Sequence, residues 1–280
     1  MKYVVVIPAH NEAAFLPGLL ASLFAQTVEP NEVVLVNDHS TDETQKIMQA
    51  ATKRYRNTHF IHKESSAKHL PGAKVVDAFN AGLKAVKSDY DILVKLDADL
   101  ILPPHYFETV LKAFELPKTG IVGGFCYEQD ATGEWKLNHP MQQDHVRGAF
   151  KAYHYDCFQA MGGLRSAMGW DTIDELLARF YGYDVKTLAE LKVKHLRPVG
   201  SNYKVAAGRR QGQAFYRMRY GGVLSFLAAL KSGWSKKSLT WSITVLRGYF
   251  ESSFKHLPFL VDEAQGKFIR AYRWKRLGKR

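Results

Sequence analysis

The chain has 280 residues, enough for one large α/β domain or for a domain with an appendage. Hydrophobic residues make up 46% of it and charged residues 24%, which is typical of a folded soluble protein. Its two cysteines, Cys126 and Cys157, are too few for a disulfide framework, so we expect a reducing compartment, the cytoplasm.

The net charge of +12 is concentrated in the last quarter of the chain. Residues 1–204 carry 23 Lys and Arg against 24 Asp and Glu, whereas residues 205–280 carry 16 against 3. This asymmetry predicts an anionic surface as the partner of residues 205–280, with a solubilising basic tail as the alternative. Nucleic acid is not expected as a partner, because no recognised nucleic-acid-binding motif accompanies the charge.

Strand-like and helix-like segments alternate over the first hundred residues. The first strand, Tyr3–Ile7, is interrupted by Pro8 and is too short for a signal peptide. Further strands are expected at Glu32–Val36, Thr58–Ile61 and Ile92–Leu96, with helices over 12–26, after Thr41 and through Val75–Leu83. This alternation predicts a parallel sheet with helices on both faces, in which ligands bind beyond the carboxyl ends of the strands.

The following hundred residues are less regular. We expect strands at Gly120–Tyr127 and Leu191–Leu196, a loop or hairpin over Glu128–Gln143, and helices at Ala149–Met161 and Asp174–Tyr181.

The last quarter contains two apolar segments, Tyr220–Leu230 and Leu239–Phe250, with helical spacing and basic flanks. Neither reaches the roughly 18–20 apolar residues that a membrane span requires. Helices of this kind fit either a membrane interface or a helical pair packed on protein, and the sequence leaves both open.

Polar residues follow three of the predicted strands. Pro8-Ala9-His10-Asn11-Glu12 follows the first, Asn37-Asp38-His39-Ser40 the second, and Asp97-Ala98-Asp99 the fourth. Two carboxylates at a strand end can share one divalent cation with a diphosphate. The Asp97-Ala98-Asp99 triplet therefore indicates an enzyme that handles a nucleotide-activated substrate.

In this order, together with Gly72-Ala73-Lys74, the motifs resemble those of family 2 inverting glycosyltransferases with a GT-A fold, over roughly residues 1–200. The resemblance implies an α/β, Rossmann-like GT-A domain at 1–204, with a mostly parallel central sheet flanked by helices. Residues 205–280 would then be a basic, amphipathic helical extension.

The resemblance also implies which residues bind the donor. Asp38 matches the position that accepts a hydrogen bond from a base imide, which favours a UDP-sugar, while Pro8 and Glu12 frame the turn beside the nucleoside. His10 occupies a position that is often aromatic or polar in the family, and its role is left open. Lys74 matches a basic position that family members direct at the nucleotide.

Asp97 and Asp99 resemble the pair that binds Mg²⁺ or Mn²⁺ and the ribose-phosphate part of the donor, and His195 matches a third metal ligand. Arg197 matches a basic residue near the diphosphate.

Inverting transfer also needs a general base for the acceptor hydroxyl, supplied in this family by a carboxylate at a helix start. The segment Gly169–Glu175 matches that region but lacks the usual Glu-Asp pair. We expect Asp174 to be the base, with Asp171 second and Glu175 third.

The expected function is therefore metal-dependent, inverting transfer of a hexosyl group from a nucleotide sugar to a saccharide or lipid-linked acceptor, in cell-surface glycan synthesis. The alternatives are a sugar-1-phosphate nucleotidyltransferase and a non-catalytic peripheral membrane protein. The first loop is not rich in glycine, which argues against a nucleotidyltransferase, and the intact acids argue against a non-catalytic protein.

Overall fold

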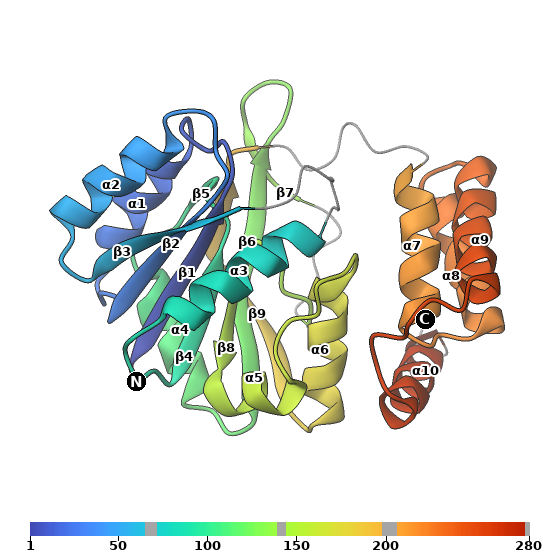
Figure 1. Ribbon diagram of the computed structural model, residues 1–280. Helices are drawn as coiled ribbons and strands as arrows, with labels where there is room; N and C mark the ends of the chain where they lie inside the picture. Colours follow the sequence, from blue (N-terminus) through green and yellow to red (C-terminus); the bar gives the residue numbers. More distant parts are fainter. Residues whose placement is uncertain (65–71, 139–143, 198–205, 278–280) are drawn as a thin grey trace.

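A computed structural model describes residues 1–64, 72–138, 144–197 and 206–277. Its centre is a single sheet with the strand order β3-β2-β1-β4-β8-β6-β9-β5 (Figure 1). The first four strands in this order are β3 (Thr58–Lys63), β2 (Glu32–Asp38), β1 (Tyr3–Ala9) and β4 (Ile92–Leu96), and they are parallel. Valine, leucine and isoleucine dominate β1, β2 and β4, which suits strands covered on both faces.

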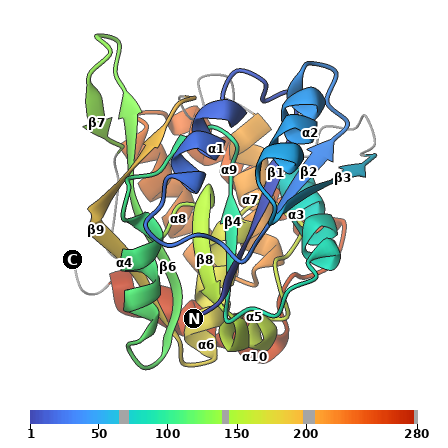
Figure 2. The same ribbon diagram turned by 90° about the vertical axis from the view of Figure 1, so that its left-hand side faces the viewer.

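The other half of the sheet is mixed in direction. Its strands are β8 (Phe150–His154), β6 (Thr119–Gln129), β9 (Asp184–His195) and β5 (Leu100–Ile101), and β7 (Trp135–Leu137) pairs with the end of β6. β8 is antiparallel to both β4 and β6, whereas β6 and β9 are parallel. Figure 2 shows β3 and β7 at opposite sides of the sheet.

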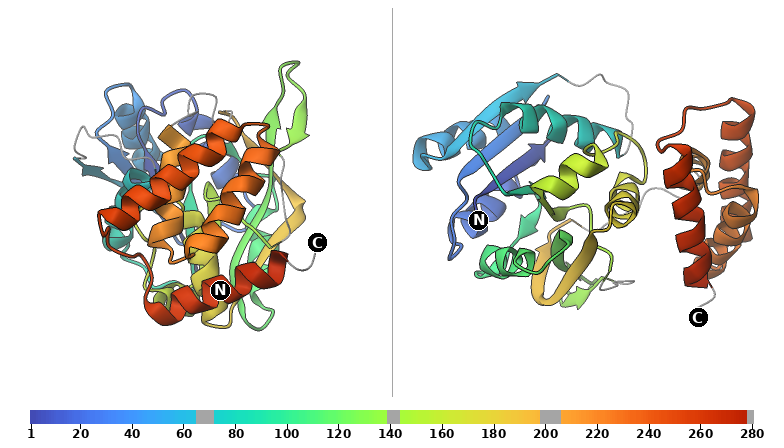
Figure 3. Two further views of the ribbon diagram at one scale, coloured as in Figure 1. Left: turned by 90° about the vertical axis from the view of Figure 1, so that its right-hand side faces the viewer. Right: turned by 90° about the horizontal axis from the view of Figure 1, so that it is seen from below.

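Helices cover both faces, as the sequence predicts. They are α1 (Leu16–Phe24), α2 (Thr44–Arg54), α3 (Ala73–Ala85), α4 (Tyr106–Phe114), α5 (Tyr155–Met161) and α6 (Trp170–Phe180). Helices α1 and α4 lie on one face of the sheet, and α3 and α5 on the other (Figure 3).

Two predicted elements differ from the structure. The helix expected at Ala149–Met161 is a strand, β8, followed by the short helix α5. Pairing on both sides, with β4 and β6, outweighs the helical spacing of these residues, because a strand inserted there completes the sheet. The helix expected from Asp174 begins at Trp170, after Gly169, whose positive φ of 80° ends the preceding loop.

The last quarter forms a bundle of four helices within residues 206–277, namely α7 (Ala206–Arg217), α8 (Gly222–Ser235), α9 (Leu239–Phe254) and α10 (Glu263–Leu277). Helix α10 lies against α6, where Phe268 contacts Phe180 and Gln265 donates a hydrogen bond to the Tyr181 hydroxyl. The expected domain boundary at 204/205 lies outside the described residues, so the division into two domains stays a prediction. None of the described helices has the length and apolar content that crossing a membrane requires.

Candidate active site

The loops after β1 and β2 form one side of the site, and they hold each other in place. Asn11 and His39 both have positive φ values, 57° and 56°, so each loop turns sharply at the strand end. The Asn11 side chain accepts a 2.8 Å hydrogen bond from the backbone N–H of Thr41, and the Asn11 N–H donates to Ser40 Oγ at 3.1 Å. We call these reciprocally bonded loops the donor side.

Asp38 lies at the end of β2 and is 6% exposed. Its Oδ1 is buried and accepts no hydrogen bond within the part of the chain that the structure describes, although Lys63 Nζ lies 3.6 Å away. His10 is exposed, and its Nδ1 contacts the backbone oxygen of Asp38 at 2.6 Å. Pro8 is buried in β1 opposite Val36 and shapes the strand end. An orphaned buried carboxylate oxygen fits a ligand's N–H donor.

The ends of β4 and β9 meet at an acidic corner. His195 Nε2 lies 3.3 Å from Asp99 Oδ1, and its Nδ1 lies 3.4 Å from Glu128 Oε1. Burial lowers the pKa of His195, but hydrogen bonds and charges from Asp99 and Glu128 outweigh it and raise the pKa. The sequence pointed to Asp99 and His195, and the structure brings them into contact.

Arg197 joins this corner to the donor side. Its Nη2 donates a 2.6 Å hydrogen bond to Glu12 Oε2, and its Nε lies 4.0 Å from Asp99 Oδ2. Burial raises the pKa of Glu12 to about 7 despite the Arg197 charge. The guanidinium is half exposed.

Several groups at the corner suit a divalent cation. Carboxylate oxygens are ligands that Mg²⁺ and Mn²⁺ accept, so Asp97 and Asp99 suit the expected ion by their chemistry, and His195 offers a nitrogen beside Asp99. Among the described residues, however, the group whose ligand atoms lie within 4.8 Å of one another is Cys126, Glu128 and His195, whereas the Asp97 carboxylate contacts Lys95 Nζ. Burial raises the pKa of the Cys126 thiol to about 11, so it stays protonated and is a poor ligand.

Lys74 lies in the first turn of α3, next to residues 65–71, which fall outside the described chain. Within the described residues, no ion pair joins Lys74 to the acidic corner. Its expected contact with the nucleotide therefore stays a prediction.

Two buried lysines form a part of the site that sequence reasoning missed. Lys95 in β4 and Lys151 in β8 are paired residues on adjacent antiparallel strands, and both are fully buried. Lys95 Nζ contacts Asp97 and donates a 2.8 Å hydrogen bond to the backbone oxygen of Gly148. Both ammonium groups lie over the Trp170 ring, at 5.2 and 5.7 Å from its centre. The sequence signal that could have revealed this part of the site was the lysine inside the apolar run Ile92–Leu96.

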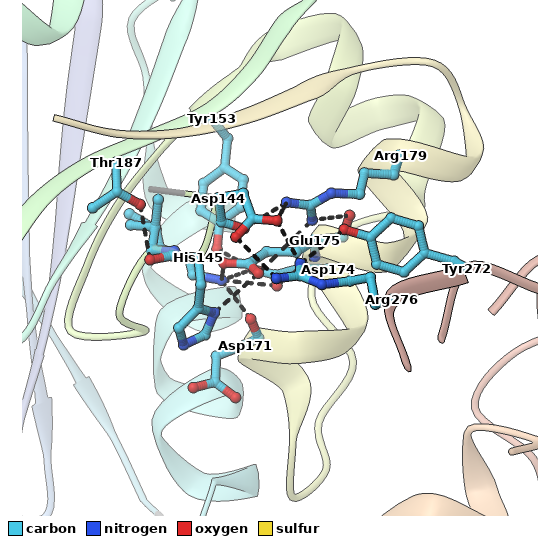
Figure 4. Close-up of polar contacts among 12 residues, drawn as sticks. Asp144, His145, Tyr153, Asp171, Asp174, Glu175, Arg179, Thr187, Tyr272 and Arg276 are labelled. Atoms are coloured by element: carbon cyan, nitrogen blue, oxygen red, sulfur yellow. Dashed lines mark hydrogen bonds and ion pairs between the residues drawn. The ribbon is translucent and has the colours of Figure 1, made fainter. Parts of the chain in front are cut away.

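Helix α6 and strand β8 carry a second group of candidate residues (Figure 4). We call these two elements together the acceptor side. Asp174 is 2% exposed, and its carboxylate receives Lys151 Nζ at 2.9 and 3.0 Å and the Tyr153 hydroxyl at 2.7 Å. Burial raises the Asp174 pKa to about 6. Asp171 is instead partly exposed in the first turn of the helix, beside Gly148.

Glu175 completes the buried charge network. It accepts hydrogen bonds from the Val146 N–H at 2.8 Å and from His145 Nδ1 at 3.0 Å, and Lys151 Nζ lies 3.1 Å away. Burial alone would raise the Glu175 pKa, but Lys151, His145 and Arg179 outweigh it and lower the pKa to about 2. The network leaves Asp171 as the acid of the three with a partly exposed side chain.

A sequence model described as Glycosyl transferase family 2 matches residues 4–169. Validoxylamine A glucosyltransferase of Streptomyces hygroscopicus subsp. jinggangensis is 33% identical over 129 residues, which cover 45% of this chain and 29% of that protein. Minor teichoic acid biosynthesis protein GgaB of Bacillus subtilis is 27% identical over 158 residues, covering 55% and 17%. The matched segment thus spans less than a third of these relatives.

Solved structures show the same fold. TarS 1–349 of S. aureus, in complex with UDP-GlcNAc, gives a TM-score of 0.59 at 16% identity and covers 91% of this chain and 73% of that chain. Mannosyltransferase PcManGT from Pyrobaculum calidifontis, in complex with GDP-Man and Mn²⁺, gives 0.56 at 15% identity, covering 99% and 80%. At such low identities the likeness shows the fold alone, and it confirms the α/β GT-A fold expected from the sequence.

Proposed function

Because the chain belongs to glycosyl transferase family 2, we propose that it transfers a sugar, with inversion, from a UDP-sugar to a hydroxyl of a saccharide or lipid-linked acceptor. One observation carries the proposal. Arg197 and His195 tie Asp99 to Glu12 and Glu128, so an acidic corner with one arginine lies at the edge of the sheet that also carries Asp38, and this combination suits a divalent cation with a diphosphate. Family membership also argues against a nucleotidyltransferase.

The donor side binds the nucleoside diphosphate in this proposal. The orphaned Oδ1 of Asp38 accepts a hydrogen bond from the base imide, and His10 and Pro8 shape the wall next to it. Lys74 and Arg197 neutralise the phosphates, which suits their positive charge.

Asp97, Asp99 and His195 would hold the divalent ion, which when bound neutralises charge on the leaving diphosphate. Asp97 is positioned for this by Lys95 and by its own backbone N–H, which donates to Ala149 at 2.7 Å. Arg197 adds a fixed cation at the same corner.

Asp171 acts as the general base in this proposal, in preference to Asp174. A base must reach the acceptor hydroxyl, and Asp174 is enclosed with both of its oxygens bonded to Lys151. Asp171 stands at the start of the same helix with its carboxylate partly exposed. It takes the hydroxyl proton as the acceptor oxygen attacks the anomeric carbon from the face opposite the diphosphate.

The test compares Asp171→Asn with Asp174→Asn. With UDP-sugars, Mn²⁺ and a saccharide panel, Asp171→Asn should keep the wild-type Tm and UDP affinity but lose transfer by about 10²–10⁴-fold. Asp174→Asn should lower the Tm, since it disturbs the buried network. The reverse pattern would return the base to Asp174, and a product with retained anomeric configuration would reject inversion.

We also propose that the outer face of α8 and α9 docks on an anionic membrane. Their outward side chains are apolar and strongly exposed, with Trp234 at 89%, Phe254 at 88% and Leu239 at 72%. These two helices lie on the side of the molecule away from the sheet (Figure 3). Exposed aromatic side chains on a basic helical segment are typical of helices in a membrane interface.

Flotation with vesicles of 30% anionic lipid tests this docking. The double variant Trp234→Ser/Phe254→Ser should shift most of the protein from the vesicle fraction to solution. Leu116→Ser is the matched control, since Leu116 is 54% exposed but lies on the sheet domain after α4. Equal flotation of wild type and double variant would contradict the proposal.

A further inference from the structure

A cavity of about 650 Å³ lies between the start of α6 and the C-terminal bundle. We call it the bundle cavity. Helices α7, α8 and α10 supply most of its wall. Its apolar lining includes Phe215, Met218, Tyr220, Leu224 and Trp241. Its volume is in the range of cavities that take a ligand of drug size.

The charged side chains that line this cavity are all basic among the described residues, namely Lys231, Arg273 and Arg276. Arg276 is held by Asp144 and by the Tyr272 hydroxyl at 3.1 Å, and so is fixed in place. Arg273 lies 5.7 Å from the centre of the Tyr220 ring, and its buried Nε has no hydrogen-bond partner within the described chain. A buried, orphaned donor of this charge fits an anionic group.

The cavity reaches the acceptor side. Met168, Gly169 and Thr172 line it, and they flank Asp171 in the sequence. Helix α8 also connects it to the exposed apolar face. Leu224, Ala228 and Lys231 of that helix face the cavity, and the neighbouring stripe Val223, Phe226, Leu230 and Trp234 is exposed. An apolar chain entering from that face could therefore lie close to the proposed base.

We propose that the bundle cavity binds the lipid part of a lipid-phosphate-linked saccharide acceptor, with Arg273 bonded to the phosphate that joins lipid and saccharide. The apolar wall and the basic side match an amphiphile with an anionic head, and neither a free sugar nor a neutral lipid uses both. That the bound lipid serves as the acceptor rests on the proposed function. Binding of the lipid phosphate does not, since it needs neither the donor nor the metal.

Binding is measured calorimetrically with monomeric dodecyl phosphate, below its micelle concentration and without vesicles, so the outer face of α8 and α9 has no bilayer to dock on. Arg273→Gln should weaken dodecyl phosphate about tenfold or more, because a hydrogen bond to a charged group is lost. Ala228→Phe should abolish binding by filling the cavity. The controls Lys275→Gln and Ala271→Phe alter exposed residues of α10 and should bind as wild type does.

Several outcomes would overturn this inference. They are wild-type affinity in both cavity variants, inorganic phosphate bound as tightly as dodecyl phosphate, or dodecyl maltoside bound equally well. If Ala228→Phe lowers the Tm, the affinity of Arg273→Gln for dodecyl phosphate alone decides whether the inference holds.

Hydrolysis of UDP-sugars in water is followed in parallel. Its absence in wild type would reject the proposed transferase while leaving the lipid result intact, and loss of lipid binding with hydrolysis retained would reject only the cavity.

Discussion

The donor side and the acceptor side of the site are held together by different interactions. On the donor side, two loops at strand ends bond to each other through short polar side chains, and much of this set is exposed. On the acceptor side, α6 rests on ionised groups inside the core, where Lys151 meets Asp174 and Glu175. Loop contacts can be remade in water, whereas a buried charge without its partner cannot be solvated.

The acceptor side depends on more of the fold than the donor side does. Each donor-side loop needs only its strand and the neighbouring parallel strand, while the acceptor-side network needs β4, β8 and α6 to be in place together. We therefore expect substitutions in the buried acceptor-side network of Lys151, Asp174 and Glu175 to act mainly through stability, and donor-side substitutions mainly through ligand affinity.

Lys151→Met should give the largest effect. It leaves two carboxylates buried without their cation, which costs about 3–5 kcal/mol of unfolding free energy. Urea unfolding measures it, with Lys112→Met as the control, since Lys112 is exposed on α4 and should change stability by less than about 0.5 kcal/mol. A Lys151→Met protein as stable as wild type would remove the distinction between the two sides.

The sequence indicated where the polar residues at the strand ends would lie, because their signals are local. Apolar strands, and polar residues directly after them, can be recognised without the fold, so Asp38 and Asp99 were expected at one edge of the sheet. The resemblance pointed to His195, which the structure places in contact with Asp99, and the binding roles of all three residues stay predictions.

The acceptor side was harder to predict because its signals are not local. Asp171 and Asp174 are both acids near one helix start, and only the position of Lys151, 20 residues before Asp171 and 23 before Asp174 in β8, separates the enclosed acid from the exposed one. The helix expected at 149–161 hid this lysine, since residues 150–154 are a strand whose buried Lys151 pairs with Lys95.

The second largest effect should be the contribution of Glu175 to stability, which depends on pH. The Glu175 pKa is lowered from 4.5 to about 2 in the folded chain, so this group stabilises the protein above pH 4.5 and loses that contribution as pH falls toward 2. Wild type should be more stable than Glu175→Gln at neutral pH, and the gap should narrow on acidification as Glu175 is protonated. The exposed Glu115→Gln should give no such gap, and a gap independent of pH would contradict this account.

Lys95 lies where the two sides meet, so Lys95→Met should affect both. Without this lysine Asp97 loses its buried partner, and we expect affinity for Mn²⁺ to fall about 10–100-fold, as when a residue supporting a metal ligand is removed. Titration of UDP-sugar hydrolysis with Mn²⁺ measures this, and Lys112→Met again serves as the control. Unchanged metal affinity with lowered stability would make Lys95 a part of the acceptor side only.

Two variants of Asn11 should give the smallest effects and separate its backbone from its side chain. Asn11→Gly keeps a residue that tolerates the φ of 57° but loses the hydrogen bond to Thr41, which costs about 1 kcal/mol. Asn11→Ala adds the strain of the left-handed backbone, about 1–2 kcal/mol more. Both should weaken UDP binding several-fold while leaving the acid stability profile unchanged, because α6 is not involved. Equal UDP affinities for Asn11→Gly and wild type would show that the donor-side loops hold their shape without this bond.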